Sequence, residues 1–288
     1  MSEPRIVVVG SVNMDLTTSV YRFPVPGETL LGTSFATSAG GKGSNQAIAA
    51  AKAGGDVIFI GAVGDDGFGR ELRQTLNAAG VDTTLLRTVN GPSGVAAITV
   101  DAHAENNIIV VAGANGSVTE LTDIDLDAIA NADVLLCQLE IPIAAVTAAA
   151  QHARSNDTTV ILNPSPAQGL PNKLIDAVDI LIVNQTEADQ LSSITDRVEH
   201  LVTTLGAGGA DLRSRDCAVH ADSPKVTPVD TTGAGDAFTG AFAVEWILDR
   251  TRALHFACAA GSLATTVHGA AASSPTRNAI EALLESSA

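Results

Sequence analysis

The chain is short of aromatic residues, basic residues and cysteines, and each shortage narrows what the protein can be. Aromatic residues make up 3% of the 288 residues, which leaves little material for an aromatic shelf under a nucleobase. Lys and Arg number 16 against 32 Asp and Glu, a formal net charge of −16. That charge disfavours nucleic acids and anionic membranes as partners. The three cysteines, Cys137, Cys217 and Cys258, lack metal-binding spacing, so we predict free thiols in a reducing compartment.

Long apolar runs are missing as well. No run reaches the ~18–20 residues that a membrane-spanning helix needs, and the N-terminus lacks the basic-then-apolar layout of a secretory signal. With 45% hydrophobic residues, many of them Ala and Val, the chain can still bury a sizeable core. These features predict a cytoplasmic enzyme with no membrane partner and no nucleic-acid partner.

The most informative segment is residues 229–237, Val-Asp-Thr-Thr-Gly-Ala-Gly-Asp-Ala, which leads into a long apolar run. This layout predicts a tight turn that opens a helix, where unpartnered N–H groups and the helix dipole favour an anion. A carboxylate beside a bound anion is electrostatically unfavourable, so its presence there indicates a chemical role. Asp236 is suited to accept a proton from a hydroxyl that attacks phosphorus. The alternative is a glycine turn in which Asp236 only caps the helix.

A second glycine segment, residues 40–46, reads Gly-Gly-Lys-Gly-Ser-Asn-Gln and also leads into a helix-like stretch. It is not a Walker A loop, because Lys42 is followed by glycine and the spaced glycines before it are missing. Small donors and acceptors on such a turn suit a polyhydroxylated ligand better than a triphosphate. Upstream, Asn13 and Asp15 lie two residues apart, so on an extended segment they point to one side and can hold adjacent hydroxyls. The alternative for this pair is ordinary turn chemistry after a strand.

Strand-like and helix-like stretches alternate along the chain, which predicts a doubly wound α/β fold whose ligands bind beyond the carboxyl ends of the strands. Two stretches break the pattern: residues 17–37 read as short strands, and residues 94–112 as a hairpin around a polar turn at 103–105. Short apolar runs suited to strands buried on both faces occur at residues 6–10, 57–60, 134–138, 160–163 and 180–184. Polar residues fall at the expected strand ends, namely Asn13, Asp15, Glu140, Asn163, Asn184 and Glu187.

Taken in order, these pieces resemble the signature segments of the PfkB carbohydrate kinase family, and most of all those of its ribose-phosphorylating members. The similarity runs from residue 6 to about residue 284, and the pair of glycine segments is its most specific part. It implies an α/β fold with a doubly wound, mainly parallel sheet flanked by helices and a small projecting β-sheet that acts as a lid. The segments that carry the resemblance are residues 10–15, 26–28, 40–46, 184–187 and 230–236.

The resemblance also implies a function and an organisation. It implies a single kinase domain over residues 1–288, with lid strands drawn from about 16–38 and 94–112, and a homodimer that pairs through the lid sheets. The implied reaction is ATP-dependent phosphorylation of D-ribose to D-ribose 5-phosphate. Asp236 is implied to be the general base, with the N–H groups of Gly233, Ala234 and Gly235 as the anion hole. The implied ribose contacts are Asn13, Asp15, Gly40, Gly41, Lys42, Asn45, Glu140 and Asp236.

Nucleotide and metal positions follow from the same resemblance. Glu187, in the family's Asn-x-x-Glu segment, is implied to act on Mg²⁺ through water, since Mg²⁺ keeps much of its hydration shell. The alternative for Glu187 is a carboxylate in the first turn of a helix. The implied ATP contacts are Asn184, Thr204, Leu205, Gly206, Ala207, Gly208, Gly209 and Gly235. A monovalent cation, K⁺, is implied beside the anion hole at Asp230, Thr232, Ala264, Val267, Gly269 and Ser273.

The chain departs from the family pattern in one place, and several functions stay open. Only 16 residues separate Glu187 from Thr204, so a helix is expected to be shortened or lost there, with an effect on the nucleotide site. The alternatives are a kinase of the same family for another sugar or a nucleoside, such as 2-deoxyribose, fructose or adenosine, or a sugar sensor without turnover. A nicotinamide dehydrogenase fits less well, because the first strand is not followed by Gly-x-Gly-x-x-Gly.

Overall fold

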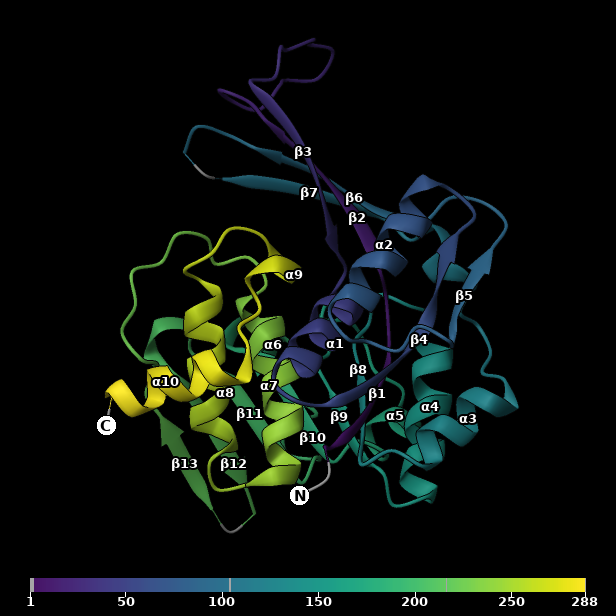
Figure 1. Ribbon diagram of the computed structural model, residues 1–288, viewed down its shortest axis with the longest axis vertical. Helices are drawn as coiled ribbons and strands as arrows, with labels where there is room; N and C mark the ends of the chain where they lie inside the picture. Colours follow the sequence, from purple (N-terminus) through teal and green to yellow (C-terminus); the bar gives the residue numbers. More distant parts are fainter. Residues whose placement is uncertain (1–2, 104, 216, 288) are drawn as a thin grey trace.

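The computed structural model describes residues 3–103, 105–215 and 217–287, and two β-sheets organise it (Figure 1). The large sheet has nine strands in the order β13-β12-β11-β10-β9-β8-β1-β4-β5. The strands from β11 to β5 are parallel, and β12 and β13 add an antiparallel edge. The bounds are β1 Arg5–Val9, β4 Asp56–Gly64, β5 Leu86–Val89, β8 Val134–Cys137, β9 Thr159–Leu162, β10 Ile180–Asn184, β11 His200–Thr204, β12 Ala210–Ser214 and β13 Ala218–Ala221.

Helices cover both faces of the large sheet because its central strands are apolar on both sides. In β1, Ile6 and Val8 belong to the core on one face, and Val7 and Val9 to the core on the other. This explains why the strand reads as a continuous apolar run. The first face is covered by α1 Lys42–Lys52, α2 Gly67–Ala78, α7 Ala234–Leu248, α8 Ala253–Ala264 and α10 Arg277–Ser287. The second face is covered by α3 Asp123–Ala130, α4 Ile143–Ser155, α5 Asn172–Ile175 and α6 Gln185–Gln190.

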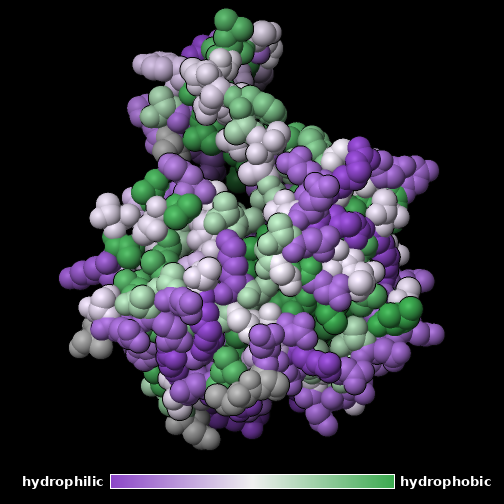
Figure 2. Space-filling view, viewed as in Figure 1, coloured by the Kyte–Doolittle hydropathy of each residue, from purple (hydrophilic) through white to green (hydrophobic). Residues whose placement is uncertain are grey.

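The small sheet projects from the main body, and its base lies beside α2 and α9 (Figure 1). Its four strands run in the order β3-β2-β6-β7. The predicted hairpin over 94–112 is confirmed as the antiparallel pair β6–β7, although Ala104 in its turn lies outside the described residues. Figure 2 shows the molecule hollowed between this projection and the body. The bounds are β2 Asn13–Ser19, β3 Ser34–Gly40, β6 Gly94–Val100 and β7 Asn106–Val111.

The predicted fold class is confirmed, with one correction of place. Asn13 and Asp15 were expected at the end of a strand of the main sheet, but they lie inside β2 of the small sheet. The reason is that β1 ends at Val9 and the chain crosses to the small sheet within three residues. Short helices complete the chain at η1 Gly113–Ser117, η2 Gly206–Gly208 and α9 Ala270–Ser273. Within the described ranges, no helix is long and apolar enough to cross a membrane.

Candidate active site

The turn before α7 has the geometry of an anion site. Gly233 adopts a left-handed conformation, with φ of 77°, and a Cβ placed there would lie 2.6 Å from the Cα of Ala270. Only glycine fits both the conformation and the space. A Cβ at Gly235 would meet nothing within 4 Å, so the backbone there faces open space. The Ala234 N–H makes a 3.3 Å bond to the Thr231 carbonyl, and the helix start leaves further N–H groups for an anion.

Asp236 lies in the first turn of α7 and is 8% exposed. Its Oδ2 accepts a hydrogen bond from Asn45 Nδ2 at 3.0 Å, and its Oδ1 accepts one from Gln46 Nε2 at 2.9 Å. Burial raises the pKa of Asp236; Lys42 and the two amides oppose that rise, and Glu140 adds to it. A buried carboxylate with a raised pKa and free lone pairs is suited to accept a proton.

Two cavities meet at this turn. The smaller has a volume of about 130 Å³ and is lined by Asp236 together with Lys42, Asn163, Asn184, Glu187, Gly233 and Gly235, among others. The larger has a volume of about 610 Å³, and its lining includes Gly206, Ala207 and Gly209 of the predicted nucleotide loop. Thr204 and Gly235 line both cavities. The anion turn therefore lies where a compartment containing the carboxylate joins one large enough for a nucleotide.

The nucleotide loop is a tight turn in which not every predicted residue lines the larger cavity. The Leu205 N–H donates to the Gly209 carbonyl at 2.8 Å, which closes the turn around η2. Leu205 and Gly208 shape this turn, whereas Asn184 lines the smaller cavity. The sequence analysis did not identify most of the remaining wall, because it comes from separate parts of the chain. These are Ser223, Pro224, Lys225, Val226 and Pro228 in a loop, Phe238 on α7, and Cys258, Gly261, Ser262 and Thr265 on α8 and at its end.

The predicted sugar residues gather where β2, β3 and the start of α1 meet. A Cβ at Gly40 would lie 2.1 Å from Oδ2 of Asp15, so this glycine makes room for the carboxylate. Burial, with the nearby charges of Glu140 and Asp236, raises the pKa of Asp15 to about 7. Glu140 Oε2 accepts hydrogen bonds from Ser11 Oγ at 2.6 Å and from the Lys42 N–H at 3.0 Å. Three carboxylates therefore share one small region.

Asn13 is oriented by a residue that sequence reasoning did not single out. Asn115, in η1, donates from Nδ2 to Asn13 Oδ1 at 2.7 Å and to the Val12 carbonyl at 3.1 Å. Its Oδ1 accepts from the Val12 N–H at 3.0 Å. Both side chains are buried, at 1% and 2% exposure for Asn115 and Asn13. No local motif marks Asn115, because it lies a hundred residues away from Asn13 along the chain.

Glu187 forms a capping box with Asn184 at the start of α6. The Glu187 N–H donates to Asn184 Oδ1 at 2.8 Å, and the Asn184 N–H donates to Glu187 Oε2 at 3.0 Å. Glu187 is thus a carboxylate in the first turn of a helix, as its alternative interpretation requires. The capping box leaves Glu187 Oε1 without a hydrogen-bond partner among the described residues, and the Glu187 side chain lines the smaller cavity together with Asp236. A single available carboxylate oxygen matches the donor chemistry of hydrated Mg²⁺.

The structure brings three of the predicted cation positions together directly. Asp230 accepts from the Thr232 N–H at Oδ1 and from the Gly269 N–H at Oδ2, both at 2.9 Å. Burial opposes ionisation of Asp230, but these bonds outweigh it and lower its pKa. The Asp230 N–H donates to the Thr265 carbonyl, next to Ala264. Ser273 Oγ donates to the Ala270 carbonyl, and within the described ranges no hydrogen bond joins Ser273 or Val267 to Asp230.

The segment before β11, where a helix was expected to be shortened, does not line the larger cavity. After α6 the chain runs in turns to His200, and Leu191 and Ile194 are 7% and 9% exposed. These side chains cover the sheet face in place of a longer helix. Among the described residues of 188–203, none lines the larger cavity. The side chains of this segment therefore lie away from the larger cavity, and its shortening relative to the family stays a prediction.

Comparison with known proteins identifies the group to which this geometry belongs. The family model of the pfkB family carbohydrate kinases matches residues 3–277. The chain is a member of that family. It is 40% identical to a ribokinase of Bacillus subtilis, over 97% of this chain and 99% of that protein. It is also 35% identical to a deoxyribokinase of Salmonella typhi, over 83% of this chain and 84% of that protein.

A solved structure extends the comparison to three dimensions. The structure of a ribokinase from Arabidopsis thaliana, complexed with ribose and ATP, superposes with a TM-score of 0.92. It covers 99% of each chain at 34% sequence identity. The carbohydrate kinase therefore has the large parallel sheet and the projecting small sheet expected from its sequence.

Proposed function

We propose that this carbohydrate kinase catalyses ATP-dependent phosphorylation of D-ribose to D-ribose 5-phosphate. The observation that carries the proposal is the position of Asp236, a buried carboxylate held by two amides where the two cavities meet. The near full-length similarity to ribokinases and to the ribose and ATP complex supports the choice of substrates. The similarity to a deoxyribokinase makes 2-deoxyribose the first competing substrate to test.

The proposed chemistry uses residues that the fold already holds in place. Asp236 accepts the proton of the primary hydroxyl of ribose as that oxygen attacks the γ-phosphorus of ATP and the bond to ADP breaks. The N–H groups of Gly233, Ala234 and Gly235 stabilise the transferred phosphoryl group, and Lys42 contributes positive charge. Ribose is held by Asn13, Asp15, Lys42, Asn45 and Glu140 and by the backbone of Gly40 and Gly41. ATP lies in the larger cavity against residues 204–209, with Asn184 toward its phosphates.

Two cations complete the proposal. Mg²⁺ would be held through water by Glu187 and would neutralise charge on the phosphates. K⁺ would take oxygens of Asp230, Thr232, Ala264, Val267, Gly269 and Ser273. The fit is supported by Asp230, which already ties the turn before α7 to the turn before α9. A fixed charge there would stiffen the turn that carries the anion hole.

We further propose that the chain acts as one kinase domain whose small sheet is a lid, and that two copies pair through these sheets. The small sheet exposes Phe35, Ile108, Ile109, Val110 and Val111, each more than half exposed. Figure 2 shows hydrophobic atoms on this projection. Large apolar side chains exposed in this number on one small sheet favour an interaction site. The three free cysteines support a cytoplasmic location.

The test is an ADP-release assay with ATP and Mg²⁺ on ribose, 2-deoxyribose, fructose and adenosine, each with K⁺ or Na⁺. We expect ribose to give the highest kcat/KM and K⁺ to stimulate turnover. A higher kcat/KM for another member of the panel moves the substrate assignment, and no turnover of any member contradicts the kinase activity. Light scattering on the same preparation tests the dimer: a mass of twice 29.2 kDa supports pairing, and a mass of 29.2 kDa contradicts it.

A further inference from the structure

A chain of buried side-chain amides leads from β8 to Asp236. Gln138, just after β8, donates from Nε2 to Gln46 Oε1 at 2.6 Å. Gln46, on α1, donates from its own Nε2 to Asp236 Oδ1 at 2.9 Å and to Asn163 Oδ1 at 3.1 Å. Asn163 in turn donates from Nδ2 to the Ile182 carbonyl at 2.9 Å. Gln46 and Gln138 are 0% and 1% exposed, so water does not compete for these bonds.

The direction of these bonds is set at the end nearer Asp236. The Ile182 carbonyl can only accept, so Asn163 must present its oxygen to Gln46. Asp236 and Asn163 thus both offer acceptors, so Gln46 presents its NH₂ group to them and its oxygen to the NH₂ group of Gln138. Reversing the Gln46 amide would place its oxygen against two acceptors and its NH₂ group against another NH₂ group. Three hydrogen bonds would be lost together inside the protein, where an unpaired polar group is costly.

Gln138 occupies its place because the residue that follows β1 is a glycine, Gly10. A Cβ at Gly10 would lie 2.2 Å from Gln138 Oε1 and 2.8 Å from the Cα of Gly43. Gln138 Oε1 itself has no hydrogen-bond partner among the described residues. The residue thus leaves one acceptor unpaired in the interior while its NH₂ group bonds to Gln46. Such an arrangement calls for an explanation, and the orientation of Gln46 supplies one.

The charges around Asp236 show what this donor contributes. Lys42 and Asn45 face Asp236 from α1, Glu140 from the segment after β8, and Asp15 from β2. Glu187 lines the same cavity from α6. Of these four charged neighbours, Lys42 is a cation, and Glu140, Asp15 and Glu187 are carboxylates. The remaining support for the ionised form of Asp236 comes from the neutral amides of Asn45 and Gln46. Removing one amide donor would favour the protonated, inactive form of Asp236 and free its side chain to rotate.

We infer that Gln46 and Gln138 are positioning residues for phosphoryl transfer: Gln138 orients the Gln46 amide, and Gln46 holds Asp236 oriented toward the attacking hydroxyl. The inference rests on the proposed kinase function and goes beyond it, because neither residue contacts the sugar or the nucleotide in that proposal. It requires that Gln138 affects Asp236 through Gln46. Replacing Gln138 should therefore change kcat only in a protein that still contains Gln46.

The experiment measures kcat and KM for ribose, with saturating ATP and Mg²⁺, from pH 5 to 9 in four proteins: wild type, Gln46→Met, Gln138→Met and the double variant. We expect Gln46→Met to lower kcat about tenfold at pH 7 and to move the acid limb of kcat/KM upward by about one pH unit. Its KM for ribose should stay within about threefold. Gln138→Met should give a smaller change in the same direction, about threefold, and the double variant should match Gln46→Met.

Controls separate the inference from loss of fold and from failure of the proposed function. Thr158→Val removes another buried hydrogen bond, from Thr158 Oγ1 to the Ile129 carbonyl, and should leave the pH profile unchanged. If Gln46→Met does not fold, Gln46→Glu keeps the shape and should move the acid limb further upward, since it adds a carboxylate beside Asp236. An unmoved limb in a folded Gln46 variant overturns the inference, as does an additive double variant. If the wild-type protein does not phosphorylate ribose, the result contradicts the proposed function rather than the roles of Gln46 and Gln138.

Discussion

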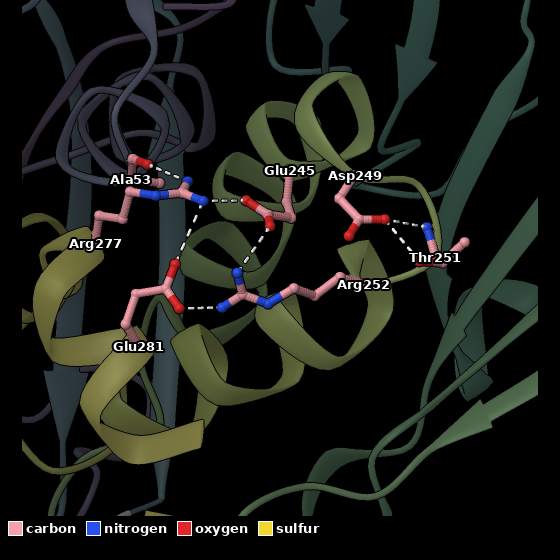
Figure 3. A network of polar contacts seen from close by, with 7 residues as sticks. All are labelled: Ala53, Glu245, Asp249, Thr251, Arg252, Arg277 and Glu281. Atoms are coloured by element: carbon pink, nitrogen blue, oxygen red, sulfur yellow. Dashed lines mark hydrogen bonds and ion pairs between the residues drawn. The ribbon is translucent and has the colours of Figure 1, made fainter. Parts of the chain in front are cut away.

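Helices α1 and α7 pack against each other, and each end of the pair holds a buried carboxylate. At one end, the hydrogen bonds that Asp236 accepts from the described part of the chain come from two neutral amides of α1. At the other, Glu245 is 1% exposed and forms ion pairs with Arg277 at 2.6 Å and Arg252 at 3.4 Å (Figure 3). The two carboxylates are nine residues apart on α7, about 13 Å along the helix.

The two ends use the same chemical group for different purposes. Arg277 also donates to the Ala53 carbonyl at the end of α1 and pairs with Glu281 on α10, so it ties three helices together (Figure 3). There the charge of Glu245 is neutralised by two guanidinium groups. At the other end the charge of Asp236 is neutralised only in part, and its pKa stays raised by burial. A carboxylate left partly unsatisfied can take a proton, whereas a fully paired one can only stabilise the fold.

The largest expected effect comes from Asp236→Asn. It removes the proposed base, so kcat for ribose should fall by about 10²–10⁴-fold. Because a buried charge is also removed, the free energy of unfolding should stay within about 1 kcal/mol of the wild-type value. The ADP-release assay and urea unfolding measure the two quantities, and ribose binding by calorimetry checks that the sugar site survives. Near-normal turnover would refute Asp236 as the base.

The opposite pattern is expected for Arg277→Met. This change leaves Glu245 buried with one remaining partner and removes the bond to Ala53. We expect a loss of about 2–4 kcal/mol in the free energy of unfolding, measured in urea, with kcat nearly unchanged at temperatures where the protein stays folded. Glu281→Gln is the matched control, because it removes an outer, 31% exposed partner of the same cluster and should cost about 1 kcal/mol or less. Equal losses of unfolding free energy in the two variants would mean that the buried charge of Glu245 does not account for the effect of Arg277→Met.

A smaller effect is expected from Asp15→Asn, through pH. Folded Asp15 keeps its proton up to a pKa of about 7, whereas an unfolded Asp releases it near 3.8. Between these values the folded state binds more protons, so stability falls as pH rises from about 4 to about 7. Urea unfolding of both proteins at pH 5 and pH 8 should show that the wild type loses about 2–3 kcal/mol more than the variant. An equal change with pH in both proteins would exclude Asp15 as the cause.

How much of the site could be predicted from the sequence depends on how local each signal is. The turn at residues 233–236 and the segment at 40–46 carry their geometry in consecutive residues, since glycines there permit conformations that other residues do not. Gln138 and Asn115 belong to no such local pattern, and although Gln46 ends the segment 40–46 and Asn163 follows a predicted strand, nothing local shows what their amides bond to. Each is a single polar residue whose partner lies on another strand or helix, and their roles depend on the direction in which buried amides point.

The sequence by itself determined the fold class and the two glycine turns, and it indicated the residues proposed to carry the reaction, because periodicity and turn chemistry act over a few residues. Only the tertiary structure decided that Asn13 and Asp15 belong to the small sheet and that the segment before β11 does not line the larger cavity. It alone decided that Asp236 is held by amides while Glu245 is locked by arginines. The physical reason is that burial and hydrogen-bond direction depend on which distant segments meet, and local sequence does not record that.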